Sequence, residues 1–257
     1  MYTKYIGNFL KWNILVWFKP CKSLSFYALL LLCLFVPMSQ GAEVDAKSTL
    51  RLQFEPIIAR VSQQLLSQHE YYKEDPKAYQ EFLDLHVRPH WDTRSTARAL
   101  IGGKSFKSLS KQAQHDLVQA VDTTLVRYAF EGIDFYSGQQ FQMVDVAISD
   151  SGKMGWVQVL MKSKILPDLN LDILVKRNKL GTWNAVDVRF KGITYVAVKK
   201  HQFKKILEKQ GVGALIASLN EKNNQFFSEL CAAEDKVEKK LVEFAKNTPH
   251  QAFKSKK

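Results

Sequence analysis

The chain of 257 residues is 46% hydrophobic and 12% aromatic, which is enough apolar surface for a sizeable core in one domain with appended segments. Its formal net charge is +12, and two of its three cysteines lie within the first 40 residues. A mature chain that begins after those residues keeps only Cys231, which excludes an internal disulfide and leaves packing as the source of stability.

The first 41 residues have the pattern of a cleavable secretory signal. A basic stretch that ends at Lys22 precedes an apolar run from Ser25 to Val36, which is shorter than the roughly 20 residues that a membrane-spanning helix needs. Small residues then lead to Gly41, after which we expect cleavage. An uncleaved anchor is the alternative, because Phe9–Phe18 is also apolar. Cleavage removes four lysines and no acid, which leaves a net charge of +8.

Two helices are expected early in the mature chain. Apolar residues recur at spacings of three and four from Leu50 to Leu65, which indicates an amphipathic helix. Asp75-Pro76 is a capping residue followed by a proline at the first helical position. Because Pro89 disfavours helical backbone before it, this second helix is expected to end near Arg88.

Two further helices are expected in the first half. Asp92 or Thr93 can cap a helix that runs to Ile101, with Gly102 at its carboxyl end. A longer helix begins near Lys111. Its apolar stripe consists of Leu117, Val121, Leu125 and Tyr128.

The period then changes from helical to alternating. Residues 141–148, 155–161 and 169–175 alternate between apolar and polar side chains and are joined by short turns, which is typical of an antiparallel meander. A fourth strand places Val186, Val188 and Phe190 on one face. Its other face carries Asp187, Arg189 and Lys191. We interpret this pattern as a sheet with one dry and one wet side, in which Asp187 lies on the wet side.

Helices return after the strands. Gly192 ends the fourth strand, and the apolar run from Ile193 to Val198 leads into a basic helix start. Helices are expected over 202–208 and 212–219, with Gly211 between them. This order indicates an α+β fold, an antiparallel sheet of four to five strands covered on one face by helices.

The chain becomes lysine-rich beyond residue 223. Apolar residues from Phe226 to Phe244 keep a helical spacing, whereas the tail from Thr248 has no period. We therefore expect three parts: a signal peptide over 1–41, a folded domain over 42–223, and a Lys-rich helix with a disordered tail over 224–257. Nucleic acid is not an expected partner, because the aromatic interleaving that base stacking needs is absent.

Motifs for catalysis or metal binding are weak. His86 and His90 are four residues apart, with Asp92 nearby, but Pro89 interrupts the spacing, so we favour helix termination and capping over a metal site. The sequence has no Gly-x-Ser-x-Gly elbow, phosphate-binding glycine loop or Cys-x-x-Cys motif. No metal, cofactor or catalytic residue is expected.

An acid/base pair remains an open alternative. Asp145, Asp172 and Asp187 lie on expected strands, and Tyr128 and Tyr195 could reach a pocket. A small enzyme acting on an apolar substrate would need one such carboxylate to be buried with a raised pKa.

Two segments with a helix between them carry a family resemblance. Val87–Gly103 contains a Pro-x-x-Asp, Ala-Arg and Gly pattern, formed by Pro89, Asp92, Ala97, Arg98 and Gly102. The second segment is matched at Gly181, Trp183, Val186, Asp187, Val188, Gly192, Gln202 and Phe203, and the helix at Gln114, Leu125, Arg127, Tyr128 and Ala129. Over about residues 50–223 the chain thus resembles the MlaC family of periplasmic phospholipid carriers, also known as toluene-tolerance auxiliary components of ABC transporters. It departs from the family at Val198-Lys199-Lys200, where Asn-Tyr-Arg is usual.

The resemblance implies an NTF2-like sheet with a helical subdomain and an apolar cavity between them. It implies a soluble periplasmic shuttle that maintains outer-membrane lipid asymmetry. Its partners would be phospholipid as cargo, an outer-membrane lipoprotein complex, and an inner-membrane ABC transporter complex with an MCE-domain subunit. Such a carrier needs no catalytic residue.

A phospholipid carrier must shield two acyl chains from water. At about 0.8 kcal/mol for each of roughly thirty methylenes, their exposure would cost on the order of 20 kcal/mol. Our candidate lipid-binding residues are the apolar side chains of the expected dry face, with two aromatic residues from helices: Val144, Val146, Val157, Val159, Leu171, Ile173, Val175, Val186, Val188, Phe190, Tyr128 and Phe203. A small pocket enzyme and a membrane-tethered interaction protein are the alternative functions.

Overall fold

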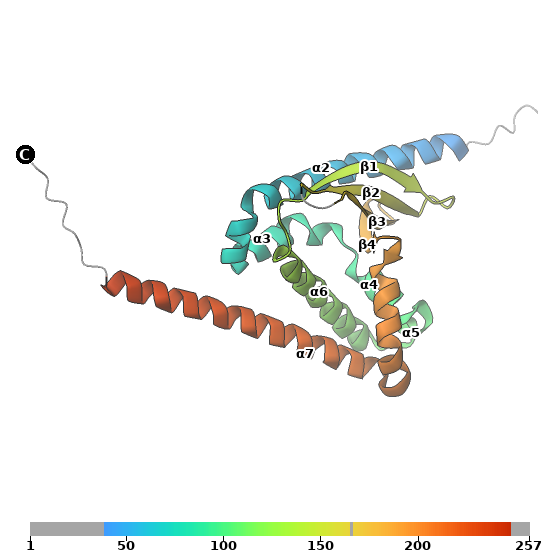
Figure 1. The fold of residues 1–257 in the computed structure, drawn as a ribbon. Helices are drawn as coiled ribbons and strands as arrows, with labels where there is room; N and C mark the ends of the chain where they lie inside the picture. The colour runs from blue at the N-terminus through green and yellow to red at the C-terminus, as the bar shows by residue number, and fades with distance from the viewer. Residues whose placement is uncertain (1–38, 165–166, 248–257) are drawn as a thin grey trace, which may run out of the picture. The chain divides into compact units, whose positions relative to one another are not determined.

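Five antiparallel strands form one sheet in the order β1-β2-β3-β4-β5. The protein is represented by a computed structural model that describes residues 39–164 and 167–247 (Figure 1). The strands are β1 (Gln140–Ile148), β2 (Met154–Lys162), β3 (Leu169–Arg177), β4 (Trp183–Phe190) and β5 (Ile193–Thr194). The predicted meander is therefore confirmed, with a short fifth strand added. Residues 1–38 of the predicted signal peptide over 1–41 lie outside the described residues.

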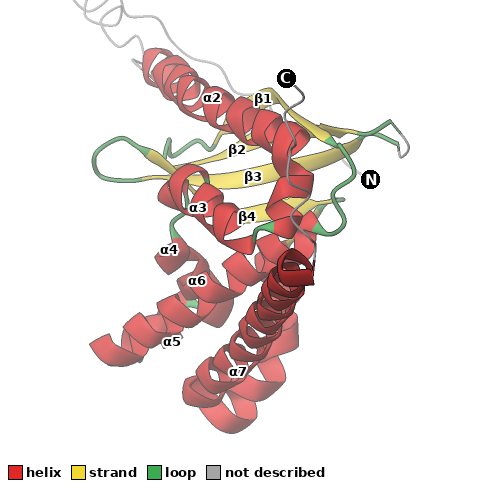
Figure 2. Cartoon of the chain, turned by 90° about the vertical axis from the view of Figure 1, so that its left-hand side faces the viewer, coloured by secondary structure: helices red, strands yellow, loops and turns green. Residues whose placement is uncertain are grey.

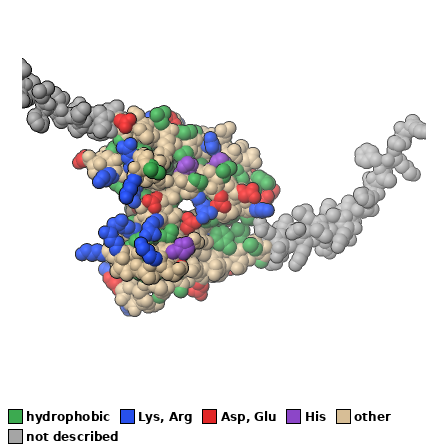
Figure 3. All heavy atoms as spheres, turned by 180° about the vertical axis from the view of Figure 1, so that it is seen from behind, with side chains coloured by type: hydrophobic (Ala, Val, Ile, Leu, Met, Phe, Trp, Pro, Cys, Tyr) green, Lys and Arg blue, Asp and Glu red, His purple; other side chains and the backbone are tan. Residues whose placement is uncertain are grey.

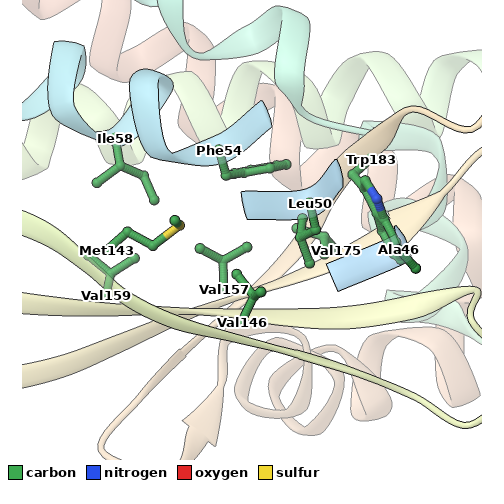
Figure 4. Close-up of a cluster of buried hydrophobic side chains, with 10 residues drawn as sticks. All are labelled: Ala46, Leu50, Phe54, Ile58, Met143, Val146, Val157, Val159, Val175 and Trp183. Carbon is green, nitrogen blue, oxygen red and sulfur yellow. The ribbon is translucent and has the colours of Figure 1, made fainter. Parts of the chain in front are cut away.

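Helix α2 (Ser39–Glu74) lies along one face of the sheet (Figure 2). Leu50, Phe54 and Ile58 follow one another at every fourth residue and are buried. They pack against the valines that alternate on that face, together with the fully buried Trp183 (Figure 4). This cluster is the core that joins helix to sheet. The predicted cleavage point after Gly41 falls in the first turn of α2.

Two polar side chains fix α2 to the backbone of the sheet. The Gln53 amide donates to the Trp183 carbonyl at 2.6 Å and accepts from the Trp183 N–H at 3.0 Å. Further along the helix, the Ser62 hydroxyl accepts from the Phe141 N–H at 2.8 Å. Because these contacts involve the first strand and the fourth, they hold the helix across the width of the sheet.

The remaining helices of the first half begin and end close to the predicted positions. Asp75 caps α3 (Pro76–His86), and its carboxylate accepts from the Ala78 N–H. A 3₁₀ turn, η1 (Arg88–His90), follows. Asp92 caps α4 (Thr93–Ile101), and a short helix that was not predicted, α5 (Gly103–Ser108), comes next.

Helices α4 and α5 pack with two longer helices in a helical subdomain. These are α6 (Lys111–Ile133) and α7 (Tyr195–Asn247). Their shared core includes Leu100, Leu117 and Leu215, and no described strand residue contributes a buried side chain to it. None of the described helices is long and apolar enough to cross a membrane.

Helix α7 bends at Gly211, whose φ of 79° is outside the helical range. The predicted break at this residue is confirmed, but α7 begins at Tyr195, before the predicted start at residue 202. The helix continues through the predicted boundary at 223, where the buried Asn223 accepts from Thr124 and Arg127 of α6. Beyond it, Phe226, Phe227 and Leu230 pack against the aromatic cluster of α3 and α6.

Two β-bulges correct the predicted face assignments. Val144 lies where the pairing of β1 with β2 shifts register, and its side chain is 54% exposed. In β4, Asp187 pairs with Leu174. Ala185 pairs with Val175, the residue after Leu174, so Val186 has no partner and is the extra residue. Val186 consequently lies on the side of Asp187, not with Val188 and Phe190 as predicted.

The wet side of β4 is also drier than predicted. Asp187 is only 5% exposed, because the start of α7 covers it. Arg189 is half-buried and pairs with Asp172 at 2.8 Å.

Leu50 and Leu52 of α2 provide a matched test of this core, because they are 0% and 75% exposed. We expect Leu50→Ala to lower the free energy of unfolding by about 2–5 kcal/mol, since it leaves a cavity between α2 and the sheet. Leu52→Ala should change it by less than about 0.5 kcal/mol. Urea unfolding followed by circular dichroism measures both. Equal losses for the two variants would contradict the packing of α2 described above.

Candidate functional site

An apolar cavity of about 240 Å³ lies between α2, the end of α3 and the sheet. Helix α2 contributes five side chains at helical spacing, and the sheet contributes side chains from the face that α2 covers. The lining residues are Phe54, Ile57, Ile58, Val61, Leu65, His86, Val87, His90, Trp91, Phe141, Val159, Leu171, Ile173 and Ala185. None of them carries a permanent charge.

The segment after η1 closes one side of the cavity. Trp91 forms a parallel bridge with Ala185 of β4, and the Asp92 N–H donates to the Ala185 carbonyl at 2.7 Å. The Trp91 indole N–H donates to the Thr96 hydroxyl at 3.0 Å, which ties the ring to α4. Pro89 shapes this connection, because it ends α3 and allows only the short 3₁₀ turn.

Three of the predicted lipid-binding residues line this cavity: Val159, Leu171 and Ile173. Val188 and Phe190 are their neighbours, since Val188 pairs with Ile173 and Phe190 with Leu171 on the same face. Three more predicted residues are buried in the adjoining core beneath α2: Val146, Val157 and Val175.

The other four predicted residues lie elsewhere. Val144 is exposed at the β1 bulge, and Val186 lines a separate groove. Phe203 packs into the core of the helical subdomain. Tyr128 of α6 faces Tyr195 of α7, with ring centroids 5.9 Å apart. Phe203 and Tyr128 therefore join helices to each other and do not line the cavity.

Sequence reasoning missed the contribution of α2 to the cavity. Ile57, Val61 and Leu65 continue the stripe that begins at Leu50, and they line the cavity where the helix and the sheet are not in full contact. The helical period did predict that these residues face inward. The period carries no information about the distance to the opposing sheet, so it could not distinguish a core residue from a cavity wall.

This architecture is found in a known protein family. The family model for the MlaC protein matches residues 55–221, which include every cavity-lining residue except Phe54. The chain belongs to the MlaC family. A solved structure with the same fold is that of a phospholipid-binding protein from Ralstonia solanacearum in complex with a phospholipid. It has a TM-score of 0.56 and 18% identity, and the match covers 70% of this chain and 98% of that one.

Two histidines lie at the edge of the cavity of this MlaC protein. Burial lowers the pKa of His90, and the nearby His86 and Arg60 lower it further, so the imidazole is neutral at pH 7. Asp92, which would have completed a metal site, instead accepts from the Ser95 N–H at 2.9 Å as the cap of α4. Within residues 39–164 and 167–247, no group of three or more His, Cys, Asp or Glu side chains is placed to hold a metal ion.

The strand carboxylates that could serve an enzyme have structural partners. Asp145 pairs with Lys47 and Arg51 on the surface, and Asp172 pairs with Arg189. The buried Asp187 accepts from the Val188 N–H at 2.9 Å and from the Val196 N–H at 3.1 Å, so it caps the start of α7. None of these three carboxylates lines the apolar cavity.

A second groove of about 370 Å³ lies between α4 and the opposite face of the sheet. Its walls include Arg98, Leu174, Lys176 and Asp187. The Lys176 amine donates to the Ser95 hydroxyl at 2.7 Å and so links β3 to α4. Figure 3 shows the molecule from behind, with Lys and Arg side chains gathered around a hollow. This mixed groove is much more polar than the cavity beneath α2.

Asp187 gives the fold a pH dependence of defined sign. Burial raises the pKa of this carboxyl above its ordinary value, so its ionisation costs stability as the pH rises through the raised pKa. The two N–H groups bond the same oxygen, Oδ1, and an asparagine side chain also offers a carbonyl oxygen at that position. We therefore expect Asp187→Asn to be more stable than the wild type at pH 7 and equal to it near pH 4.

Asp75→Asn is the control with the opposite sign. The Ala78 N–H lowers the pKa of Asp75, so its ionised form stabilises the fold, and the substitution should reduce stability at pH 7. Thermal melting across this pH range tests both variants. A loss of stability in Asp187→Asn at pH 7 would show that the hydrogen bonds to the carboxylate outweigh its burial.

Proposed function

We propose that this protein is a periplasmic carrier that binds a phospholipid by its acyl chains in the cavity beneath α2. The observation that carries the proposal is the cavity itself, whose lining has no permanently charged side chain. Membership of the MlaC family and the fold shared with the Ralstonia solanacearum phospholipid-binding protein support it. The proposed acyl-chain contacts are Val159, Leu171 and Ile173 from the sheet, and Ile57, Val61 and Leu65 from α2.

The cavity must widen to hold its cargo. Pockets for drug-sized ligands occupy about 300–1,000 Å³, and a phospholipid with two acyl chains is larger than most such ligands. The volume of about 240 Å³ therefore accommodates part of one chain. Widening requires α2 to move away from the sheet near Val61 and Leu65, which line the cavity on either side of Ser62. Each buried methylene then contributes about 0.8 kcal/mol.

The carrier function needs no covalent step. The hydrophobic effect favours acyl chains inside the cavity or inside a bilayer over acyl chains in water, while the charged headgroup stays in water. We propose that the protein exchanges cargo with an outer-membrane lipoprotein complex and with an inner-membrane ABC transporter complex that has an MCE-domain subunit. In this role it would maintain the lipid asymmetry of the outer membrane.

The cavity proposal predicts that a bulky side chain on α2 excludes cargo. Ile57 lines the cavity and is only partly buried, so Ile57→Trp can fill the space without severe strain. We expect several-fold less phospholipid in the purified variant, measured by mass spectrometry of extracted lipids. Leu66→Trp is the matched control, because Leu66 lies on the same helix, is 43% exposed and does not line the cavity.

Two results would contradict the carrier proposal. One is a wild-type protein that is free of phospholipid and takes none up from vesicles. The other is a wild-type lipid content in Ile57→Trp.

Export predicts a shortened amino terminus. We propose that residues 1–41 are a signal peptide, so Edman sequencing of the protein isolated from the cell envelope should begin at Ala42. A retained Met1 would instead favour a membrane-tethered protein.

A further inference from the structure

The turn between β4 and β5 holds a lysine in a conformation that lysine rarely adopts. Lys191 has φ of 49° and Gly192 has φ of 81°, the sign pattern of a two-residue type I′ turn. Asn or Asp followed by Gly is preferred there, because other side chains are strained at positive φ. Lys191 is the only described residue other than glycine with positive φ. This conformation of Lys191 is therefore unfavourable for stability, which points to a functional role for its positive charge.

Large apolar side chains beside this lysine face solvent. Phe190 and Ile193 pair directly across the turn and are 42% and 61% exposed. Thr194 caps α7 by accepting from the Ala197 N–H, which puts Ile193 and Val198 at the two positions of a hydrophobic staple. Val198 remains 41% exposed. The three side chains thus form one apolar patch, which we call the hairpin patch.

The segment that contains the hairpin patch is rich in positive charge. Residues 189–210 contain seven Lys and Arg side chains and a single acid, Glu208. Lys200, Lys204 and Lys205 lie on the first half of α7 and are all exposed, and only Lys204 of these three lies close to an acid, Glu208 at 3.9 Å. The Lys199 amine lies 4.8 Å from the centre of the Tyr128 ring, which holds it at the start of the helix.

The hairpin patch is continuous with the cavity. Phe190 pairs with Leu171, and Leu171 lines the cavity beneath α2. The patch therefore extends the apolar face of the sheet outward to the turn.

We propose that the hairpin patch docks on the surface of an anionic phospholipid bilayer. Exposed aliphatic and aromatic side chains that insert into the interface, surrounded by lysines that attract anionic headgroups, are the chemistry of interfacial membrane binding. Docking would bring the face that leads to the cavity next to the bilayer. That consequence rests on the proposed carrier function, whereas the surface contact itself does not.

Vesicle co-sedimentation of the purified protein that begins at Ala42, without the apolar run of the signal segment, tests the contact. The vesicles contain phosphatidylcholine with about 30% phosphatidylglycerol, which supplies the anionic charge, or phosphatidylcholine alone. We expect binding to the anionic vesicles only, and weaker binding at high salt. Lys191→Asn should weaken it about fivefold, and Lys191→Asp should weaken it further. Ile193→Ser should weaken it about tenfold.

The Lys191 variants separate a functional effect from a folding defect. Because Asn-Gly and Asp-Gly suit this turn, both variants should melt about 2–4 °C above the wild type while binding vesicles less well. The turn before β4 provides matched controls, Lys179→Asn and Leu180→Ser. Leu180 is 90% exposed, and this turn lies at the other end of the strand, about 26 Å away. These controls should bind vesicles like the wild type.

Lipid content distinguishes this proposal from the carrier function. Phospholipid in the wild type, with equal vesicle binding by all variants, overturns the hairpin patch alone. A protein free of phospholipid that keeps the expected order of vesicle binding overturns the carrier function alone. An acidic protein partner in place of a bilayer would leave the anionic vesicles unbound, which also overturns the hairpin patch.

Discussion

The contact between α2 and one face of the sheet is the interaction on which the rest of the structure depends. The first half of the helix packs closely on the valines of that face, and Leu50 and Phe54 are almost fully buried there. The second half stands over the same face but leaves a cavity, which Val61 and Leu65 line. One continuous apolar stripe therefore provides both the stability of the domain and its candidate site.

This division has an energetic consequence. An empty apolar cavity costs stability, by roughly 24 cal/mol per Å³ in well-studied cores, because its walls lose dispersion contacts. In the proposed function, an acyl chain that fills the cavity would restore those contacts and stabilise the folded protein by mass action. The Gln53 and Ser62 hydrogen bonds hold the helix in register on the sheet beside this cavity. The proposed function would thus couple stability and cargo binding through the same helix.

Local signals allowed much of the fold to be predicted from the sequence. Asp75 and Asp92 cap helices as their chemistry requires, Gly211 breaks a helix, and the alternating segments form a meander. The candidate site was less predictable. Each β-bulge adds one residue and reverses the alternation after it, which moved Val144 and Val186 off the expected face. Apolar side chains stand next to one another at both bulges, at Met143-Val144 and at Ala185-Val186, so the sequence pattern did not show which of the two is the extra residue.

Strand β4 connects the features that function requires. Its face toward α2 carries Ala185 in the cavity wall and Phe190 next to the exposed turn. On its other side the bulge turns Asp187 toward α7, where the carboxylate caps the helix that begins immediately after β5. The bulge therefore lets one short strand face the cavity and bind the helical subdomain. Because β4 ends at Phe190, immediately before the Lys191-Gly192 turn, the proposed docking surface and the cavity wall lie on the same strand.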